Sequence, residues 1–175
     1  ISTHLEIDVK NKIYCTTGSL GHGLPIAAGM AMARKKQGLK GKIYVLISDG
    51  ECQEGTTWET LLIAAKHKLD NLVILVDYNK IQALDFLSDA LPLNNLKKKF
   101  LSFNCNCIEV KKGHNFDSIR KAFINLNKNK NLPSVIVFHT VKGKGIKEFE
   151  NDPMWHAKKI REKEMKIGKK SLGLS

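Results

Sequence analysis

Apolar residues along the chain gather in short runs that alternate with segments of helical period. Residues 42–48, 72–77 and 134–139 are nearly continuous in apolar, largely β-branched residues, and residues 105–110 form a weaker fourth run. Runs of this length are typical of strands that are covered on both faces, as in a parallel sheet. The pattern therefore predicts four strands.

The segments between these runs carry apolar residues at steps of three and four, which indicates helices. These positions are Trp58, Leu61, Leu62, Ala65 and Leu69 in one segment, and Ile119, Ala122, Phe123 and Leu126 in another. An earlier segment, residues 24–36, is rich in Ala and Met. We expect Thr56 or Thr57 to cap the first of the two periodic helices. Strict alternation of helix and strand predicts right-handed crossovers in a doubly wound α/β fold, with a mostly parallel sheet and helices on both faces.

Length and composition indicate one globular domain, since the chain has 175 residues, 42% hydrophobic and 26% charged. No apolar run approaches the roughly 18–20 residues that cross a bilayer, so we expect no membrane span. The chain begins without Met, so we expect an incomplete N-terminus. Residues 1–150 are predicted to form the domain, and residues 151–175 a charged tail that contains Trp155 and His156.

The net charge is +12, from 29 basic and 17 acidic residues. The lysine runs have Asn and Glu neighbours and no interleaved aromatic residues on which bases could stack, which favours a solvated surface over a nucleic-acid site. The four cysteines form no C-x-x-C pair and the histidines lack zinc-ligand spacing, so we expect reduced thiols and a cytoplasmic protein.

Candidate chemistry follows two of the predicted strands directly. Asp49, Gly50 and Glu51 come after the first strand, and Asn79 and Ile81 come after the second. Ligands of such folds bind at the carboxyl ends of strands, and thirty positions with one helix between them place Asp49 and Asn79 at neighbouring strand ends. A carboxylate, an amide oxygen and a backbone carbonyl suit magnesium, which keeps positions open for phosphate oxygens. Taken alone, the same residues are equally compatible with ordinary caps and turns.

A third candidate is the glycine-rich segment TTGSLGHG at residues 16–23, which precedes the Ala-rich helix. Glycines there allow backbone to approach a ligand closely, and a helix N-terminus favours phosphate. A flexible connector would have the same composition.

Five motifs in order, TTGSLGHG, SDGECQEGTTWE, DYNKIQ, HTVKGKG and DPMWHAK, resemble the diphosphate-binding N-terminal domain of transketolases. The resemblance runs from about residue 4 to residue 156. It implies thiamine diphosphate and Mg²⁺ as cofactors and the thiamin diphosphate-binding fold. The family's Gly-Asp-Gly is here Ser48-Asp49-Gly50, and Leu5 replaces the family's usual Pro.

The resemblance also implies roles for individual residues. The metal ligands would be Asp49, Asn79 and the main-chain carbonyl of Ile81. Asn79 and Ile81 would also contact the cofactor. Further cofactor contacts would come from Gly18, Leu20, Gly50 and Glu51. His156, His4 and Glu54 would be the catalytic residues, with the two histidines at the substrate mouth. Glu54, with Glu59, would belong to an acidic network across a dimer interface that links two active sites.

The implied activity is transfer of a two-carbon ketol unit between sugar phosphates of the pentose phosphate type. Nothing after His156 resembles the family's pyrimidine-binding domain, so we expect a partner domain or subunit, in a homodimer or a heterotetramer. The alternatives are a 1-deoxyxylulose-5-phosphate synthase-like enzyme and a non-catalytic transketolase-like subunit. A nucleic-acid-binding module is a further alternative that the charge alone suggests.

Overall fold

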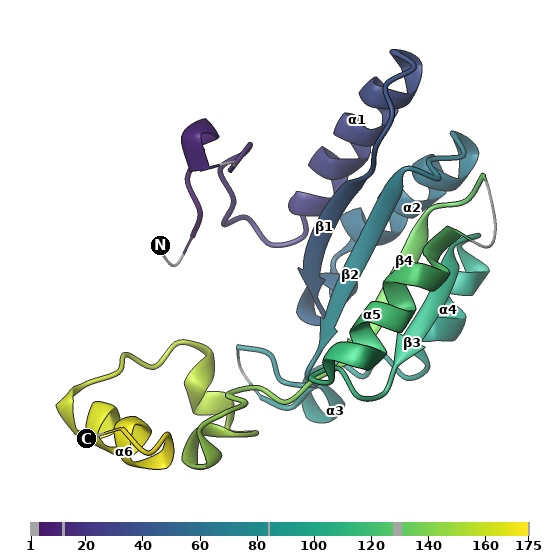
Figure 1. Ribbon diagram of the computed structural model, residues 1–175. Helices are drawn as coiled ribbons and strands as arrows, with labels where there is room; N and C mark the ends of the chain where they lie inside the picture. The colour runs from purple at the N-terminus through teal and green to yellow at the C-terminus, as the bar shows by residue number, and fades with distance from the viewer. Residues whose placement is uncertain (1–3, 12, 84, 128–130, 175) are drawn as a thin grey trace.

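The computed structural model describes residues 4–11, 13–83, 85–127 and 131–174. Its centre is a parallel sheet in the order β1-β2-β4-β3 (Figure 1). The strands are β1 (Ile43–Ser48), β2 (Leu72–Tyr78), β3 (Asn106–Val110) and β4 (Ser134–His139). In this register Ser48 pairs with Asp77, and Tyr78 pairs with His139, so the strands end at a common carboxyl edge. The four strands and the parallel sheet predicted from the apolar runs are confirmed.

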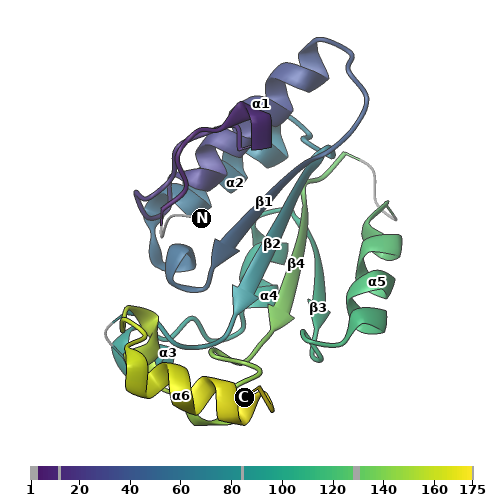
Figure 2. The ribbon, with the colours of Figure 1, turned by 60° about the vertical axis from the view of Figure 1, so that its left-hand side comes forward.

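Helices cover both faces of the sheet, as expected (Figures 1 and 2). One face packs against α1 (Gly23–Lys36), α2 (Gly55–Lys66) and α4 (Leu96–Ser102) in the larger core cluster. The other face packs against α5 (Phe116–Ile124) in a smaller cluster around Val73, Ala122 and Ile136. The 3-10 helix η3 (Asn125–Asn127) extends α5.

The second face is covered over only part of its width. The side chains of Tyr44 and Leu46 on β1 point to this face and are 53% and 69% exposed. Parallel sheets are normally buried on both faces. Over the described residues, the β1 half of this face therefore has an apolar surface open to solvent.

Two expectations for α2 are wrong. Its N-cap is Glu54, without a side-chain cap, while Thr56 and Thr57 lie inside the helix and direct their hydroxyls to other segments. Leu62, which the apolar spacing placed on the same face as Leu61, is 59% exposed. The buried face instead carries Leu61 and Ala64 together with two threonines, Thr57 and Thr60, because their hydroxyls find carbonyl partners and so tolerate burial.

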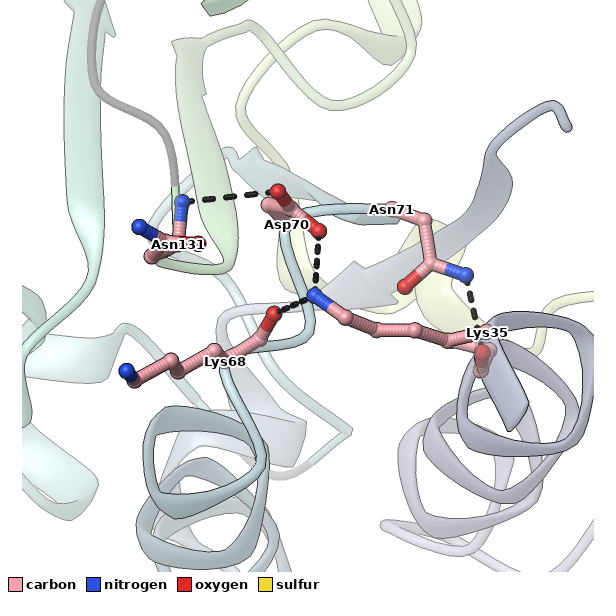
Figure 3. A network of polar contacts seen from close by, with 6 residues as sticks. Lys35, Lys68, Asp70, Asn71 and Asn131 are labelled. Carbon is pink, nitrogen blue, oxygen red and sulfur yellow. Dashed lines mark hydrogen bonds and ion pairs between the residues drawn. The ribbon is translucent and has the colours of Figure 1, made fainter. Parts of the chain in front are cut away.

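At the amino edge of the sheet a polar network ties three segments together (Figure 3). The Lys35 ammonium, at the end of α1, donates to the Lys68 carbonyl and to Asp70 Oδ1, the latter at 2.7 Å. Asp70 Oδ2 accepts from the backbone N–H of Asn131 at 3.4 Å, and Asn71 donates to the Ala31 carbonyl at 2.8 Å. The network fixes the turn that leads from α2 into β2.

The carboxyl edge is flanked by short elements: η2 (Gly50–Gln53), α3 (Leu87–Ala90), η4 (Lys147–Phe149), η5 (Pro153–His156) and α6 (Glu162–Ser171). The Phe149 and Trp155 rings stack with centroids 3.7 Å apart, and a Cβ on Gly168 would lie 3.3 Å from Ile146. The C-terminal segment thus packs across the expected boundary at residue 150. Figure 2 shows α6 below the strand ends.

The remaining short helix, η1 (Val9–Asn11), belongs to the N-terminal segment, which lies at the side of the molecule (Figure 1). Among the described helices, none is both long and apolar enough to cross a bilayer. All four cysteines are free thiols, and burial raises the pKa of Cys105 and of Cys107 to about 12.

Candidate cofactor-binding site

The ends of three adjacent strands converge where the candidate chemistry was expected. Asp49 follows β1, Asn79 follows β2, and these strands pair directly. The Asp49 N–H donates to the Asp77 carbonyl at 3.2 Å, and the Thr140 N–H, after β4, donates to the Tyr78 carbonyl at 3.3 Å. Backbone pairing therefore continues past the strands and holds these residues side by side.

Asp49 is a buried carboxylate, only 1% exposed. Its Oδ2 accepts from the Lys80 N–H at 2.6 Å. Burial raises the Asp49 pKa and the nearby Asp77 charge adds to the rise, whereas the Lys80 hydrogen bond and the Lys142 charge oppose it. A carboxylate with so little water around it favours the approach of a cation.

Asn79 lies on a tight backbone segment that turns its side chain inward. Its Oδ1 accepts from the Ile81 N–H at 2.9 Å, and its Nδ2 donates to Asp77 Oδ2 at 3.1 Å. Lys80, between them, has a left-handed backbone with φ of 67°. Ile81 is 3% exposed and forms a bridge with Phe86. The structure thus brings together Asp49, Asn79 and Ile81, the three predicted metal ligands.

The loop after β1 is fixed by side chains of α2. Thr57 Oγ1 donates to the Glu51 carbonyl at 2.6 Å, and Trp58 Nε1 donates to the Cys52 carbonyl at 3.0 Å. The Glu51 carboxylate accepts from the Ser48 N–H at 2.8 Å. The Glu51 side chain, expected at the cofactor, is therefore bonded to its own loop.

Gly50 is not required by the packing of the loop. A Cβ there would lie 3.7 Å from Ser48 Oγ, an ordinary contact. A glycine at this position leaves room for a ligand to approach the backbone closely.

A second group of predicted residues lies on the N-terminal and glycine-rich segments. A Cβ on Gly18 would lie 3.4 Å from the His4 ring, and the Thr17 N–H donates to the Leu5 carbonyl at 2.8 Å. His4 and Gly18 are therefore direct neighbours. Leu20, in the same loop, is 54% exposed.

Glu54 joins the glycine-rich segment to α2. Gly21 has φ of 76°, and a Cβ there would lie 2.8 Å from Glu54 Cβ. Thr56 Oγ1 donates to the Gly21 carbonyl at 2.9 Å. Glycine at 21 is required both by the left-handed backbone and by this close approach. Glu59, one turn further along α2, is exposed.

Lys142 and His156 complete the carboxyl edge. Partial burial lowers the pKa of His156, and the Lys142 charge lowers it further. The same Lys142 charge acts on Asp49. Lys142 also lines a cavity of about 510 Å³ together with Asp77, Asn79 and Thr140. His156 is thereby linked electrostatically to the Asp49 end of the edge.

Asp77, Thr140 and Lys142 were not among the predicted site residues. Thr140 and Lys142 belong to the HTVKGKG motif, which was a usable signal. Asp77 is the first residue of the DYNKIQ motif, but it is also the last residue of an apolar strand, and it was not singled out.

The donor set fits magnesium better than a softer metal. Over residues 4–11, 13–83, 85–127 and 131–174, no three His, Cys, Asp or Glu side chains are grouped as metal ligands. The predicted ligands are instead one carboxylate, one amide oxygen and one backbone carbonyl, which are hard donors and too few to complete a shell. Such a site needs further oxygen ligands, and phosphate oxygens are suitable.

Comparison with known proteins gives a consistent result over the whole chain. The family model described as "Transketolase, thiamine diphosphate binding domain" matches residues 1–175. The chain is 41% identical over 167 residues to an apulose-4-phosphate transketolase subunit of Actinobacillus succinogenes, covering 94% of this chain and 60% of that protein. It is 35% identical over 162 residues to the 6-deoxy-6-sulfo-D-fructose transketolase subunit SqwG of Clostridium sp., covering 93% of this chain and 58% of that protein.

A solved structure agrees with these matches. Transketolase from Campylobacter jejuni superposes with a TM-score of 0.84 at 30% identity, over 95% of this chain and 27% of that one. The chain spans less than two thirds of the length of each of the two curated relatives described above.

Proposed function

Since this chain belongs to the transketolase family, as a thiamine-diphosphate-binding domain, we propose that it holds the cofactor's diphosphate through Mg²⁺ in a two-chain or multidomain transketolase. The observation that carries this proposal is the meeting of a buried Asp49 with Asn79 and Ile81 at adjoining strand ends. Two relatives are named as transketolase subunits, which supports a partner that supplies the pyrimidine-binding part.

In this proposal the chain's own residues bind and orient. Asp49, Asn79 Oδ1 and the Ile81 carbonyl hold Mg²⁺, and Gly50 leaves room for the diphosphate. Lys142 adds a positive charge at the same edge. When bound, thiamine diphosphate supplies the carbanion-stabilising carbon that ketol transfer requires.

The histidines serve the substrate. The lowered pKa of His156 keeps its imidazole neutral at pH 7, so that it can exchange a hydrogen bond or a proton with a sugar hydroxyl. We assign His4 the same side of the mouth, with Gly18 and Leu20 beside the cofactor and Glu51 shaping the loop. Glu54 is proposed to face a second copy across the assembly interface.

The proposal extends to the assembly and its setting. A homodimer or heterotetramer with the pyrimidine-binding subunit, acting on sugar phosphates in the cytoplasm, fits the free thiols and the basic surface. Residues 151–175 would act as the tail that carries His156 to the mouth.

Reconstitution tests the activity. The full chain, mixed with the pyrimidine-domain subunit, thiamine diphosphate and Mg²⁺, is expected to transfer a ketol unit from xylulose 5-phosphate to an aldose phosphate. His156→Ala should lower turnover with little change in cofactor affinity. Products from pyruvate and glyceraldehyde phosphate would instead indicate 1-deoxyxylulose-5-phosphate synthesis, and cofactor binding without turnover would indicate a non-catalytic subunit.

A further inference from the structure

Asp77 lies between two polar side chains at the carboxyl edge of the sheet. Its Oδ2 accepts from Asn79 Nδ2 at 3.1 Å, and its Oδ1 accepts from the Thr140 hydroxyl. The three side chains line the same cavity. Thr140 follows β4, the strand next to β2, so the carboxylate is held from a neighbouring strand as well as from its own.

The two partners of the Asn79 amide have opposite hydrogen-bonding character. A carboxylate such as that of Asp77 only accepts, whereas the backbone N–H of Ile81 only donates. An asparagine amide has nearly the same shape in both orientations, so its partners decide which end is oxygen. With Asp77 at one end and Ile81 N–H at the other, only one orientation satisfies both hydrogen bonds.

We infer that Asp77 is a positioning residue for the metal site, held by Thr140, and that it fixes the Asn79 amide with Oδ1 toward the metal position. This inference rests on the proposed function. An amide turned the other way would present NH₂, which carries no lone pair for Mg²⁺. Outer partners that orient a metal ligand commonly change affinity by about 10–100-fold when they are removed.

Asp77 also carries a negative charge close to Asp49, and charge alone would attract a cation. The Thr140 hydroxyl separates the two explanations, because removing it leaves the Asp77 charge in place. Thr140→Val removes the hydrogen bond that holds the carboxylate, and Thr140→Ser keeps a hydroxyl at the same position. An orientation role predicts that Thr140→Val loses Mg²⁺-dependent cofactor binding and that Thr140→Ser retains it.

The experiment is calorimetric titration of the full chain with thiamine diphosphate at several Mg²⁺ concentrations. Asp77→Asn and Thr140→Val are each expected to weaken Mg²⁺-dependent binding by about 10–100-fold. Thr140→Ser should bind as the unmodified chain does. Asp89→Asn, on the exposed surface of α3, removes the same charge elsewhere and should also bind normally.

The outcomes distinguish this inference from the proposed function. If the Asp49→Ala variant still binds thiamine diphosphate in the presence of Mg²⁺ as the unmodified chain does, the proposed function itself is overturned. Loss in Asp49→Ala with normal binding in Asp77→Asn would overturn only the role of Asp77. Loss in Asp77→Asn with normal binding in Thr140→Val would leave Asp77 as a charge and overturn its orienting role.

A spectroscopic readout keeps the test independent of cofactor binding. In ¹⁵N spectra of the unliganded chain, the Asn79 side-chain NH₂ signals, assigned with Asn79→Asp, should exchange slowly with solvent. Thr140→Val should speed that exchange and Thr140→Ser should restore it. Equal exchange in all three proteins would contradict the orientation that we infer.

Discussion

Lys80 links local backbone strain to the candidate metal site. Its φ of 67° places a residue with a Cβ in the left-handed region, and its N–H donates to Asp49 at 2.6 Å. The conformation persists because this hydrogen bond and the one from the Leu87 N–H to the Lys80 carbonyl, at 2.8 Å, fix the backbone on both sides.

The effect of a Lys80 substitution on stability should depend on how well the new residue tolerates positive φ, and not on the loss of the charge. A β-branched side chain is least tolerated at positive φ, so Lys80→Val should destabilise the chain by about 1–2 kcal/mol. Lys80→Asn should be close to neutral, since Asn enters this region readily. Urea denaturation measures both, and equal stability of the two variants would contradict the strain argument.

Lys142 should contribute to the lowered pKa of His156. Burial is the larger cause of the lowered His156 pKa and Lys142 the second, so Lys142→Met should raise that pKa only partway to the usual histidine value. At neutral pH the imidazole is uncharged, and it gains its proton as the pH falls through the lowered pKa. NMR titration of the His156 ring measures this, with Lys144→Met as the control, since that lysine pairs with Glu150 at 3.0 Å. The same pKa in Lys142→Met as in the unmodified chain would contradict the assignment.

At the residue scale the sequence predicts Asp49 and Asn79 but not Asp77 with Thr140. The first pair follows consecutive strands that pair directly, so chain order alone places them together. The second pair depends on β4 lying next to β2, although β3 comes between them along the chain. No local pattern encodes that insertion.

At the element scale the apolar runs recover the strands to within one residue at each end, because strands buried on both faces need an unbroken apolar run. The phase of α2 is less predictable. Two of its buried positions are threonines, which hydropathy scores as surface residues, and their hydroxyls donate to the carbonyls of Glu51 and Thr56. The helix face predicted from the apolar spacing is therefore offset by one residue from the face that is buried.

The edge strand β3 is attached to β4 by a polar cluster at its carboxyl end. Glu109 Oε1 accepts from Lys111 Nζ at 2.8 Å and from His139 Nε2 at 2.6 Å. Lys111 and then His139 hold the Glu109 pKa below its usual range, against a smaller rise from burial. A lowered acid pKa means that the stability is present at neutral pH and is lost as the pH falls through that pKa.

Glu109→Gln should therefore destabilise the chain at pH 7 by about 1 kcal/mol or less, since Lys111 is largely exposed. The difference from the unmodified chain should shrink as the pH falls below the ordinary glutamate pKa of about 4.3. Urea denaturation at pH 7 and pH 4 measures it. A difference that stays constant over this interval would show that the charge of Glu109 is not the cause.

At the scale of the whole molecule, one half-face of the sheet is open. Leu46 is 69% exposed on this face, while its neighbour Ile47 is 2% exposed on the other. Leu46→Lys should cost the isolated chain less than about 1 kcal/mol, and Ile47→Lys about 3–5 kcal/mol, because it buries an unpaired charge. Thermal denaturation compares them. A large loss in Leu46→Lys would mean that this face is covered in solution.

Mg²⁺-dependent binding of thiamine diphosphate at the Asp49–Asn79 edge is the property on which the proposed function depends. Calorimetry of the full chain, alone and with the pyrimidine-domain subunit, measures it directly. We predict binding that needs Mg²⁺, disappears on chelation, and weakens by more than about 100-fold in Asp49→Ala, beyond the usual effect of outer partners. An affinity for thiamine diphosphate that does not depend on Mg²⁺, or that is unchanged in both Asp49→Ala and Asn79→Ala, would contradict the proposed site.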